Sequence, residues 1–287
     1  MLIDDIKPYL CCPDDGRPIS IRSGRIVCLG CGREYSILAE NFIEMLPSKF
    51  PAWELQDGAP KGAEQMSIEE FHKEFEWEPK SSGWGDLSSA SQGYRAFYQA
   101  QGMAIYEGLN PQGTEIAIDV SGAVGNHSVA LADKVRVMVN CDLHGPSILT
   151  AYQRRKENMI CVRAPYLRLP FYSGTFDYAI CTDTLIRGRT HEVKLLREIT
   201  RILKPGGKAV VDFHNRRLGS SSNAISLAYS LGEVKSILHE AGIGKHEIFP
   251  FAHIPLRFVP TERLYGLMDV FARIFLDGAR HMVLFTK

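Results

Sequence analysis

The chain has 287 residues, a length that suits one full α/β domain with a small additional module. Hydrophobic residues make up 45% of the chain, enough for an ordinary buried core. Lysine plus arginine and aspartate plus glutamate both number 33, so no overall positive field would attract nucleic acid or an anionic membrane. This balance argues against a nucleic-acid partner and favours a small, enclosed substrate.

The N-terminus and the hydropathy predict a cytoplasmic protein. Residues 1–5 lack the basic start and the apolar stretch of a secretory signal, and no run of about 18 apolar residues is present. Of seven cysteines, four crowd near the N-terminus, whereas Cys141, Cys161 and Cys181 lie in apolar stretches typical of strands. In a cytoplasmic protein, the four N-terminal cysteines indicate a metal site, and the other three indicate buried thiols.

Residues 1–46 are predicted to form a small module with short β-like runs at 25–27 and 34–37. Such a module is too short to hold a conventional core unaided. Proline and glycine punctuate the next residues, which predicts an irregular linker over 47–66.

Residues 67–287 are predicted to form one α/β domain. A helical lid is expected over 67–108, with helices at 67–76 and 89–108, and an insertion over 253–279 carries an apolar stripe at helical spacing. That stripe suits core packing, a homodimer surface or the wall of an acceptor pocket. Apolar strands are expected near 115–120, 135–141, 159–163, 176–181, 207–213, 245–251 and 280–286. Runs that are apolar on both faces predict a Rossmann-like, seven-stranded, mostly parallel sheet with helices on both faces.

The first expected strand of this domain runs directly into a turn of small residues, Ser121-Gly122-Ala123-Val124-Gly125. Small residues let the backbone approach a ligand at the carboxyl end of a strand, where open α/β sheets bind ligands. The glycine spacing of a dinucleotide site is absent. Asp142 closes the second strand, where a carboxylate can accept hydrogen bonds from both hydroxyls of a ribose. Together these features indicate a nucleoside site, the alternative being a merely tight turn.

Three ordered motifs carry a resemblance to a known family. Residues 119–125 are similar to an Asp-x-Gly-x-Gly-x-Gly motif, residues 169–178 to a Leu-Pro-Phe…Phe-Asp stretch, and residues 196–208 to a helix ending in Leu-Lys-Pro-Gly-Gly. Over about residues 95–287 the chain thus resembles the class I S-adenosylmethionine-dependent methyltransferases. The resemblance implies a cofactor site made of Asp119, Ser121, Gly122, Ala123, Gly125, Asp142, Leu143, Ala164, Pro165, Tyr166, Thr182 and Tyr98.

The chain departs from the family pattern in the residues around the cofactor. Ser121 and Ala123 stand where the family has glycines, and Ala123 would be strained if its position required a positive φ. Pro165 replaces an acidic residue near the adenine, which leaves Ala164 and Tyr166 to supply apolar or stacking contact. These departures motivate one alternative, a noncatalytic partner protein with a methyltransferase fold.

Methyl transfer to a hydroxyl acceptor would use a general base, most often histidine. His214 follows the fifth strand of the domain at the expected ligand edge and is the candidate catalytic base, a structural hydrogen-bonding role being the alternative. Asp183, after the fourth strand, is the second catalytic candidate, since it could orient an acceptor. Tyr98 lies on the helix before the first strand and suits either a lid or an aromatic stripe packed on the sheet. His191 is predicted to be solvated.

The N-terminal cysteines form two turns that end in glycine and are similar to zinc knuckles. The predicted tetrahedral set is Cys12, Asp15, Cys28 and Cys31, with the Asp15 carboxylate in place of a fourth thiolate. Cys11 is a poorer ligand because adjacent cysteines rarely converge on one ion. The zinc-ribbon-like module resembles the small zinc-binding activator subunit of eukaryotic tRNA and release-factor methyltransferases, and the zinc domain of bacterial 23S rRNA guanine-N1 methyltransferases. The resemblance implies a structural Zn²⁺, and a ribbon that has lost its metal is the alternative.

The sequence therefore predicts a cytoplasmic methyltransferase that uses S-adenosyl-L-methionine on a small-molecule acceptor. A second hypothesis is an rRNA or tRNA base methyltransferase that docks RNA through the ribbon. The basic residues of the ribbon are matched by acidic ones, which argues for packing over phosphate contact.

Overall fold

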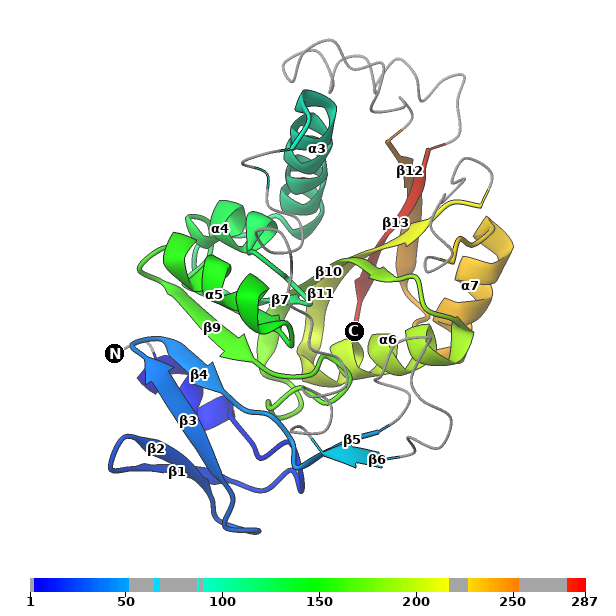
Figure 1. Cartoon of the computed structure of the whole chain (residues 1–287). Coiled ribbons are helices and arrows are strands. Elements are labelled where there is room, and N and C mark those ends of the chain that lie inside the picture. Colours follow the sequence, from blue (N-terminus) through cyan, green and yellow to red (C-terminus); the bar gives the residue numbers. More distant parts are fainter. Residues whose placement is uncertain (1–2, 52–64, 68–86, 88–89, 217–226, 253–277) are drawn as a thin grey trace.

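The computed structural model describes residues 3–51, 65–67, 87, 90–216, 227–252 and 278–287 (Figure 1). Within these residues, eleven strands form one mixed sheet in the order β1-β2-β3-β4-β9-β8-β7-β10-β11-β13-β12, and β5 pairs with β6 in a separate ribbon. The strands are β1 (Ile19–Arg22), β2 (Arg25–Cys28), β3 (Glu34–Ala39), β4 (Phe42–Glu44), β5 (Lys49–Pro51), β6 (Gln65–Ser67), β7 (Ile116–Val120), β8 (Val137–Asp142), β9 (Met159–Arg163), β10 (Phe176–Leu185), β11 (Leu203–His214), β12 (His246–Phe251) and β13 (Arg280–Thr286).

Helices cover both faces of the seven strands β7–β13, as the sequence predicts. They are α3 (Gln92–Leu109), α4 (Asn126–Ala132), α5 (Gly145–Arg154), α6 (Arg189–Ile202) and α7 (Leu231–Glu240), while α1 (Ile3–Ile6) and a 3-10 turn at Lys7–Tyr9 belong to the N-terminal residues. The two faces follow from strand alternation: in β7, Ile116 and Ile118 pack in a core with residues of α6 and α7, whereas Ala117 packs with residues of α3 and α4. Figure 1 shows the two helical layers on opposite sides of the sheet.

The predicted strand number of seven was wrong, because the sheet continues past β9 into the N-terminal residues. All seven expected strands are present as β7–β13, and β9, β8, β7, β10 and β11 are parallel. The next strand, β4, then pairs with β9 in parallel, and β3, β2 and β1 follow in antiparallel order. The sheet as a whole is therefore mixed, with antiparallel strands at both ends.

The N-terminal residues share their core with the rest of the chain. Ile3, Ile6 and Tyr35 are buried in the same cluster as Leu169 and Phe171. Backbone hydrogen bonds join the two parts: the amide of Cys11 donates to the Pro170 carbonyl, and the amide of Tyr172 donates to the Tyr9 carbonyl. This shared core explains how a segment too short to bury a core of its own is held in place.

Several expected segments differ in detail or lie outside the described residues. The expected helix at 89–108 is α3, which begins after Ser91, whose hydroxyl accepts a hydrogen bond from the amide of Tyr94. The predicted linker contains β5 and the first residues of β6 instead of being irregular throughout. Ser67, the predicted start of the helix at 67–76, is instead the last residue of β6; the rest of that expected helix and almost all of the 253–279 insertion are not among the described residues. None of the described helices is both long enough and apolar enough to cross a membrane.

Because β4 belongs to the common sheet, damage to it should destabilise the whole chain. Ile43 is fully buried between β3 and β9. We expect Ile43→Ala to lower the free energy of unfolding by about 2–5 kcal/mol through lost contacts and a cavity. Leu38→Ala, on β3 where the side chain is 50% exposed, should change it by roughly 0.5 kcal/mol or less. Urea denaturation of the full chain measures both. An Ile43→Ala effect confined to a separate early transition would contradict the common core.

Candidate functional site

The loop after β7 holds three residues in the left-handed backbone region. Their φ angles are +61° at Ser121, +44° at Ala123 and +76° at Gly125. An L-residue in this region is strained by roughly 1–2 kcal/mol, so Ser121 and Ala123 carry strain that glycine would avoid. Ala123 therefore has the positive φ at which the sequence analysis expects strain.

Gly122 in the same loop allows a close approach between the loop and two polar side chains of the sheet. A Cβ at this position would overlap Asn140 Oδ1 and lie 2.7 Å from Asp119 Cγ. The Ser128 hydroxyl, from α4, donates to Asp119 Oδ2 at 2.8 Å and also lies 3.2 Å from Asn140 Oδ1. The loop is thus packed directly on the strand ends, with no space for a side chain at Gly122.

Asp142 ties the loop after β7 to the loop after β8. Its Oδ2 accepts a hydrogen bond from the amide of Ala123 at 2.8 Å, and its Oδ1 accepts one from the amide of His144 at 2.7 Å. Burial raises the pKa of Asp142, against the lowering effect of these hydrogen bonds and of Arg163 and Arg187. Each carboxylate oxygen can accept a second hydrogen bond, so the group retains acceptor capacity for a ligand.

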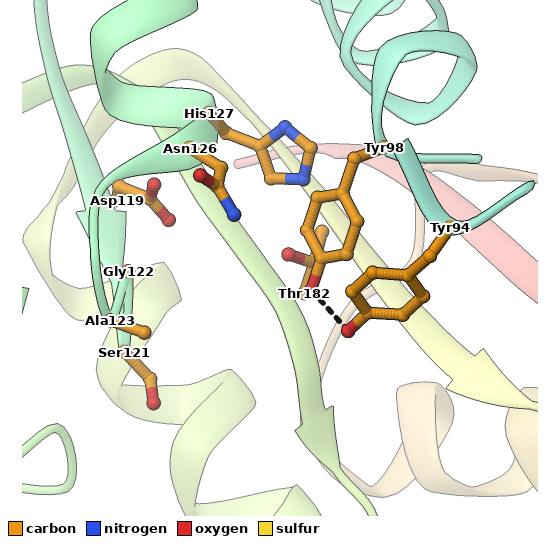
Figure 2. Close-up of a pocket in the computed structure, with 9 residues that line it drawn as sticks. All are labelled: Tyr94, Tyr98, Asp119, Ser121, Gly122, Ala123, Asn126, His127 and Thr182. Atoms are coloured by element: carbon orange, nitrogen blue, oxygen red, sulfur yellow. Dashed lines mark hydrogen bonds between the residues drawn. The ribbon is translucent and has the colours of Figure 1, made fainter. Parts of the chain in front are cut away.

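A cavity of about 120 Å³ opens beside this loop (Figure 2). Its lining residues are Tyr94, Tyr98, Asp119, Ser121, Gly122, Ala123, Asn126, His127 and Thr182. In Figure 2 the loop residues lie on one side, the two tyrosines of α3 lie on the other, and Thr182 at the end of β10 lies between them. The cavity is therefore at the carboxyl ends of the parallel strands, where ligands bind in this architecture.

The tyrosine wall is held by aromatic packing and hydrogen bonds. Tyr98 stacks on His127 with ring centroids 5.4 Å apart, and Tyr94 meets Tyr98 edge-on at 5.0 Å. The Tyr94 hydroxyl donates to the Tyr98 hydroxyl, which in turn donates to Asp183 Oδ2, both at 3.3 Å. Tyr98 therefore lines the cavity while it also packs against Phe97 and the core, so both expected roles of this helix stay open.

Two ionisable groups of the lining are shifted toward their neutral forms. Burial raises the pKa of Asp119 to about 7, with the hydroxyl of Ser128 opposing the shift. Burial lowers the pKa of His127 to about 4, so its imidazole is neutral at pH 7. His127 Nε2 lies 2.9 Å from Gln101 Oε1, and Gln101 Nε2 donates to Asp212 Oδ2 at 3.3 Å. Since Gln101 presents its oxygen to His127, the ring proton of His127 is on Nε2.

Asp183 and His214 are brought together at the ends of β10 and β11. Asp183 Oδ1 lies 3.5 Å from His214 Nε2 and 2.8 Å from Arg280 Nη2. The register of β10 against β11 shifts between Cys181 and Leu185, and Asp183 adopts a φ of +55°. Burial acts to raise the pKa of Asp183, but Arg280 and then His214 bring it below its ordinary value. Asp183 is therefore an anion beside the imidazole.

The loop after β9 is anchored by a separate polar cluster. Ala164, Pro165 and Tyr166 are all buried there. The Tyr166 hydroxyl lies 3.2 Å from His191 Nε2, and His191 Nδ1 lies 2.9 Å from Glu192 Oε2. His191 is only 9% exposed, so the expectation that it is solvated was wrong. Its position between a phenol and a buried carboxylate explains the difference, because Tyr166 is 25 residues away in sequence and the adjacent Glu192 is itself fully buried.

Comparison with known proteins agrees with this geometry. Residues 118–211, which run from β7 into β11, match the family described as a methyltransferase domain. The chain therefore contains a methyltransferase domain. Two demethylmenaquinone methyltransferases are similar to it: that of Beutenbergia cavernae is 31% identical over 108 residues, and that of Corynebacterium kroppenstedtii is 32% identical over 103 residues.

These similarities cover only part of each protein. The matched segments span 38% and 36% of this chain and 44% and 43% of the relatives, so the chain matches less than half of either curated relative. Among solved structures, an S-adenosylmethionine-dependent methyltransferase from Thermotoga maritima, a possible histamine N-methyltransferase, superimposes with a TM-score of 0.52 at 18% identity, over 68% of this chain and 91% of that chain. At that identity the similarity establishes the fold alone.

The methyltransferase domain gathers part of the predicted cofactor set around the cavity. The predicted residues that line it are Tyr98, Asp119, Ser121, Gly122, Ala123 and Thr182. The other six do not line it: Gly125 ends the loop before α4, Asp142 accepts the hydrogen bond from the Ala123 amide, and the rest lie on the neighbouring loops after β8 and β9, namely Leu143, Ala164, Pro165 and Tyr166. Asp183 adjoins the cavity through Tyr98, and His214 adjoins it through Asp183.

Four residues of this region were missed by sequence reasoning: Gln101, His127, Asp212 and Arg280. Asp212 lies inside the apolar run of β11, and an acidic residue in such a run is a signal of a buried polar contact. Gln101, which is fully buried on α3, carries a similar but weaker signal. The partners of Arg280, Asp183 and Asp212, are far from it in sequence, so no local sequence pattern indicates these contacts.

An ion pair links the N-terminal strands to the methyltransferase domain beside Asp142. Glu44 of β4 is opposite Arg163 of β9, and their side chains meet at 2.7 Å. Arg163 Nε also donates to the Leu143 carbonyl at 3.2 Å, and its charge lowers the pKa of Asp142 against the effect of burial. The N-terminal strands thus reach the edge of the sheet on which the cavity lies.

The predicted metal ligands Cys12, Asp15, Cys28 and Cys31 form a compact cluster, in which one donor atom from each residue lies within 4.8 Å of the others. Cys12 Sγ is 3.8 Å from Cys31 Sγ, and Cys28 Sγ is 3.4 Å from Asp15 Oδ1. The amides of Gly30 and Cys31 point at Cys28 Sγ, at 3.2 and 3.4 Å. Cys11 is outside the cluster and interacts electrostatically with Arg201 instead.

The strained loop of the methyltransferase domain gives a stability prediction. We expect Ala123→Gly to raise the free energy of unfolding by about 0.5–1 kcal/mol, because relief of the left-handed strain exceeds the entropy of the added glycine. Ala104→Gly, in the middle of α3, should instead lower it by about 1 kcal/mol. Chemical denaturation compares the two variants with the parent. A loss of stability in both would show that Ala123 is not strained.

Proposed function

We propose that this chain is an S-adenosylmethionine-dependent methyltransferase that acts on a small-molecule acceptor. The observation that carries the proposal is the loop 121–125, in which Gly122 leaves no room for a side chain and Ala123 is fixed by Asp142, inside the matched region. These residues fit a nucleoside, because the backbone can approach it closely and Asp142 has acceptor capacity left for ribose hydroxyls.

S-adenosylmethionine supplies a methyl group on a cationic sulfur, which is a good leaving group. The chain's own residues would then bind and orient. Asp142 would hold the ribose, and the buried loop with Ala164, Pro165 and Tyr166 would offer an apolar surface to the adenine. Tyr98 lines the opposite side of the cavity and Thr182 lies between, where they would confine the reacting methyl group. Such positioning can supply much of the rate acceleration.

His214 is the proposed general base for an acceptor that must lose a proton, and Asp183 orients it. The support is their approach at 3.5 Å next to the tyrosine wall. The similarity to two demethylmenaquinone methyltransferases makes a quinol-type hydroxyl the first acceptor to test. A hydroxyl of this kind becomes more nucleophilic when a base removes its proton.

The role of Asp142 gives the first test of the proposed function. Calorimetric titration of the parent with S-adenosylmethionine should show saturable binding. Asp142→Asn should weaken the affinity about 10- to 100-fold, since hydrogen bonds to a charged group contribute about 1.5–3 kcal/mol. Asp133→Asn, at the exposed end of α4, should bind as the parent does. Thermal unfolding without ligand separates lost binding from lost folding.

The proposed cofactor site would be refuted if the parent gave no heat and no thermal shift at millimolar ligand. Equal affinities of the parent and a folded Asp142→Asn variant would show that Asp142 does not bind the cofactor. The methyltransferase activity would still be tested separately by the acceptor assay. Turnover of demethylmenaquinol with labelled S-adenosylmethionine then tests the acceptor class.

The proposal extends to residues 1–46 as a zinc-binding module. Zinc bound tetrahedrally at about 2.3 Å to sulfur and about 2.1 Å to oxygen separates its ligands by about 3.8 Å for two sulfurs and about 3.6 Å for sulfur and oxygen. The distances of 3.8 Å between Cys12 and Cys31 and of 3.4 Å between Cys28 and Asp15 fit that geometry. Amide donors directed at Cys28 Sγ would stabilise it as a thiolate.

Metal analysis tests the module. The purified parent should contain about one zinc per chain by mass spectrometry, and Cys28→Ser should contain almost none, because one of four ligands is lost. Cys11→Ser is the matched control: the residue is a buried neighbour of Cys12 but outside the cluster, so its zinc content should equal that of the parent. Equal zinc in the parent and Cys28→Ser, or no zinc in the parent, would contradict the proposed ligands.

A further inference from the structure

Arg280 is the cationic centre of a polar cluster that includes the proposed catalytic residue Asp183. It is the first residue of β13 and lies directly opposite His214 in the antiparallel pairing with β11. Its guanidinium contacts two carboxylates, with Nη2 2.8 Å from Asp183 Oδ1 and Nε 3.2 Å from Asp212 Oδ2. The guanidinium carbon also lies 5.5 Å from the centre of the Phe97 ring. Arg280 is thus fixed on several sides.

The two carboxylates around Arg280 are also joined through the backbone. The amide of Asp183 donates to Asp212 Oδ1 at 2.7 Å. Asp183 has a φ of +55°, a conformation that is strained for a residue with a side chain and persists only where the surroundings impose it. Asp212 and Arg280 impose this conformation, because Asp212 accepts the hydrogen bond of the Asp183 amide and Arg280 binds the Asp183 carboxylate.

The result is a carboxylate aimed at one nitrogen of His214. Asp183 Oδ2 accepts from the Tyr98 hydroxyl, which leaves Oδ1 shared by Arg280 and His214 Nε2. His214 Nε2 is shielded from solvent and makes no hydrogen bond to the described residues, and it lies 3.5 Å from the charged oxygen Asp183 Oδ1. A lone pair on Nε2 would face an anion, whereas an N–H there would be attracted to it. The imidazole is therefore favoured in the form with its proton on Nε2.

Resting on the proposed role of His214, we infer that Arg280 is a positioning residue: it holds Asp183 against His214 Nε2, so that Nδ1 is the atom that accepts the acceptor's proton. The opposite strands β11 and β13 make this possible, because they place Arg280 and His214 side by side. Without Arg280, two buried carboxylates would adjoin with no cation between them, and Asp183 would be neutral or displaced. The imidazole would then lose its fixed orientation.

The test is the tautomer of His214, observed in the full chain by ¹⁵N nuclear magnetic resonance above the titration range of the ring. The parent should show a protonated Nε2 and an unprotonated Nδ1. Arg280→Gln should bring the two nitrogen signals toward each other, as exchange between the neutral forms becomes faster and less biased. Arg280→Lys should lie closer to the parent because it retains the charge. Arg216→Gln, which removes an exposed cation two residues from His214, should leave the spectrum unchanged.

A proton on Nδ1 in the parent would overturn the inference, as would a folded Arg280→Gln variant with the parent's two nitrogen signals. If Arg280→Gln fails to fold, Asp183→Ala tests the same link, because it removes the carboxylate that Nε2 faces; retention of the parent spectrum would again overturn it. Failure of the proposed function is recognised separately, as absence of S-adenosylmethionine binding by the parent.

Discussion

The hydrogen bond from the amide of Ala123 to Asp142 is the interaction on which the cavity depends. It joins the loop after β7 to the end of β8, and the second oxygen of the same carboxylate accepts the amide of His144. Ala123 has a φ of +44°, so the loop would relax without this anchor. Gly122 is pressed onto Asp119 and Asn140 only while the loop is held there. One buried carboxylate therefore fixes the backbone wall of the site.

The opposite wall is fixed in a different way, by side chains from several elements. Tyr98 of α3 reaches Asp183 of β10, and Arg280 of β13 joins Asp183 to Asp212 of β11. Gln101, one turn after Tyr98 on α3, extends the network from Asp212 to His127 at the start of α4. The network thus returns to the backbone wall, because His127 is the second residue of α4, which begins directly after the loop. One polar network therefore connects the two walls, and Figure 2 shows two of its members, Tyr98 and His127, at the cavity.

The sequence predicted the features that are made by residues close together along the chain, and it missed those that are made by distant residues. The strands β7–β13 were predicted because each is a continuous apolar run, and the cysteine cluster because each turn brings its ligands together within a few residues. The loop after β7 was predicted from a short motif, and strain at Ala123 was expected only if its φ were positive. Arg280, Asp212 and Gln101 were missed because their contacts join three elements that are distant along the chain. The extension of the sheet was missed for the same reason, since β4 and β9 are far apart in sequence.

The extension of the sheet also has a physical reason, which involves both the edge of the α/β domain and the short N-terminal segment. Without β4, the edge strand would be β9, whose Cys161 and Val162 are buried and whose backbone groups would be unpaired on one side. The N-terminal residues are too few to bury a core alone, so both parts gain from the pairing. Because the register sets Glu44 opposite Arg163, the same contact delivers a cation beside the Leu143 carbonyl and Asp142. The strands that complete the sheet therefore also help to set the electrostatics at the edge where the cavity lies.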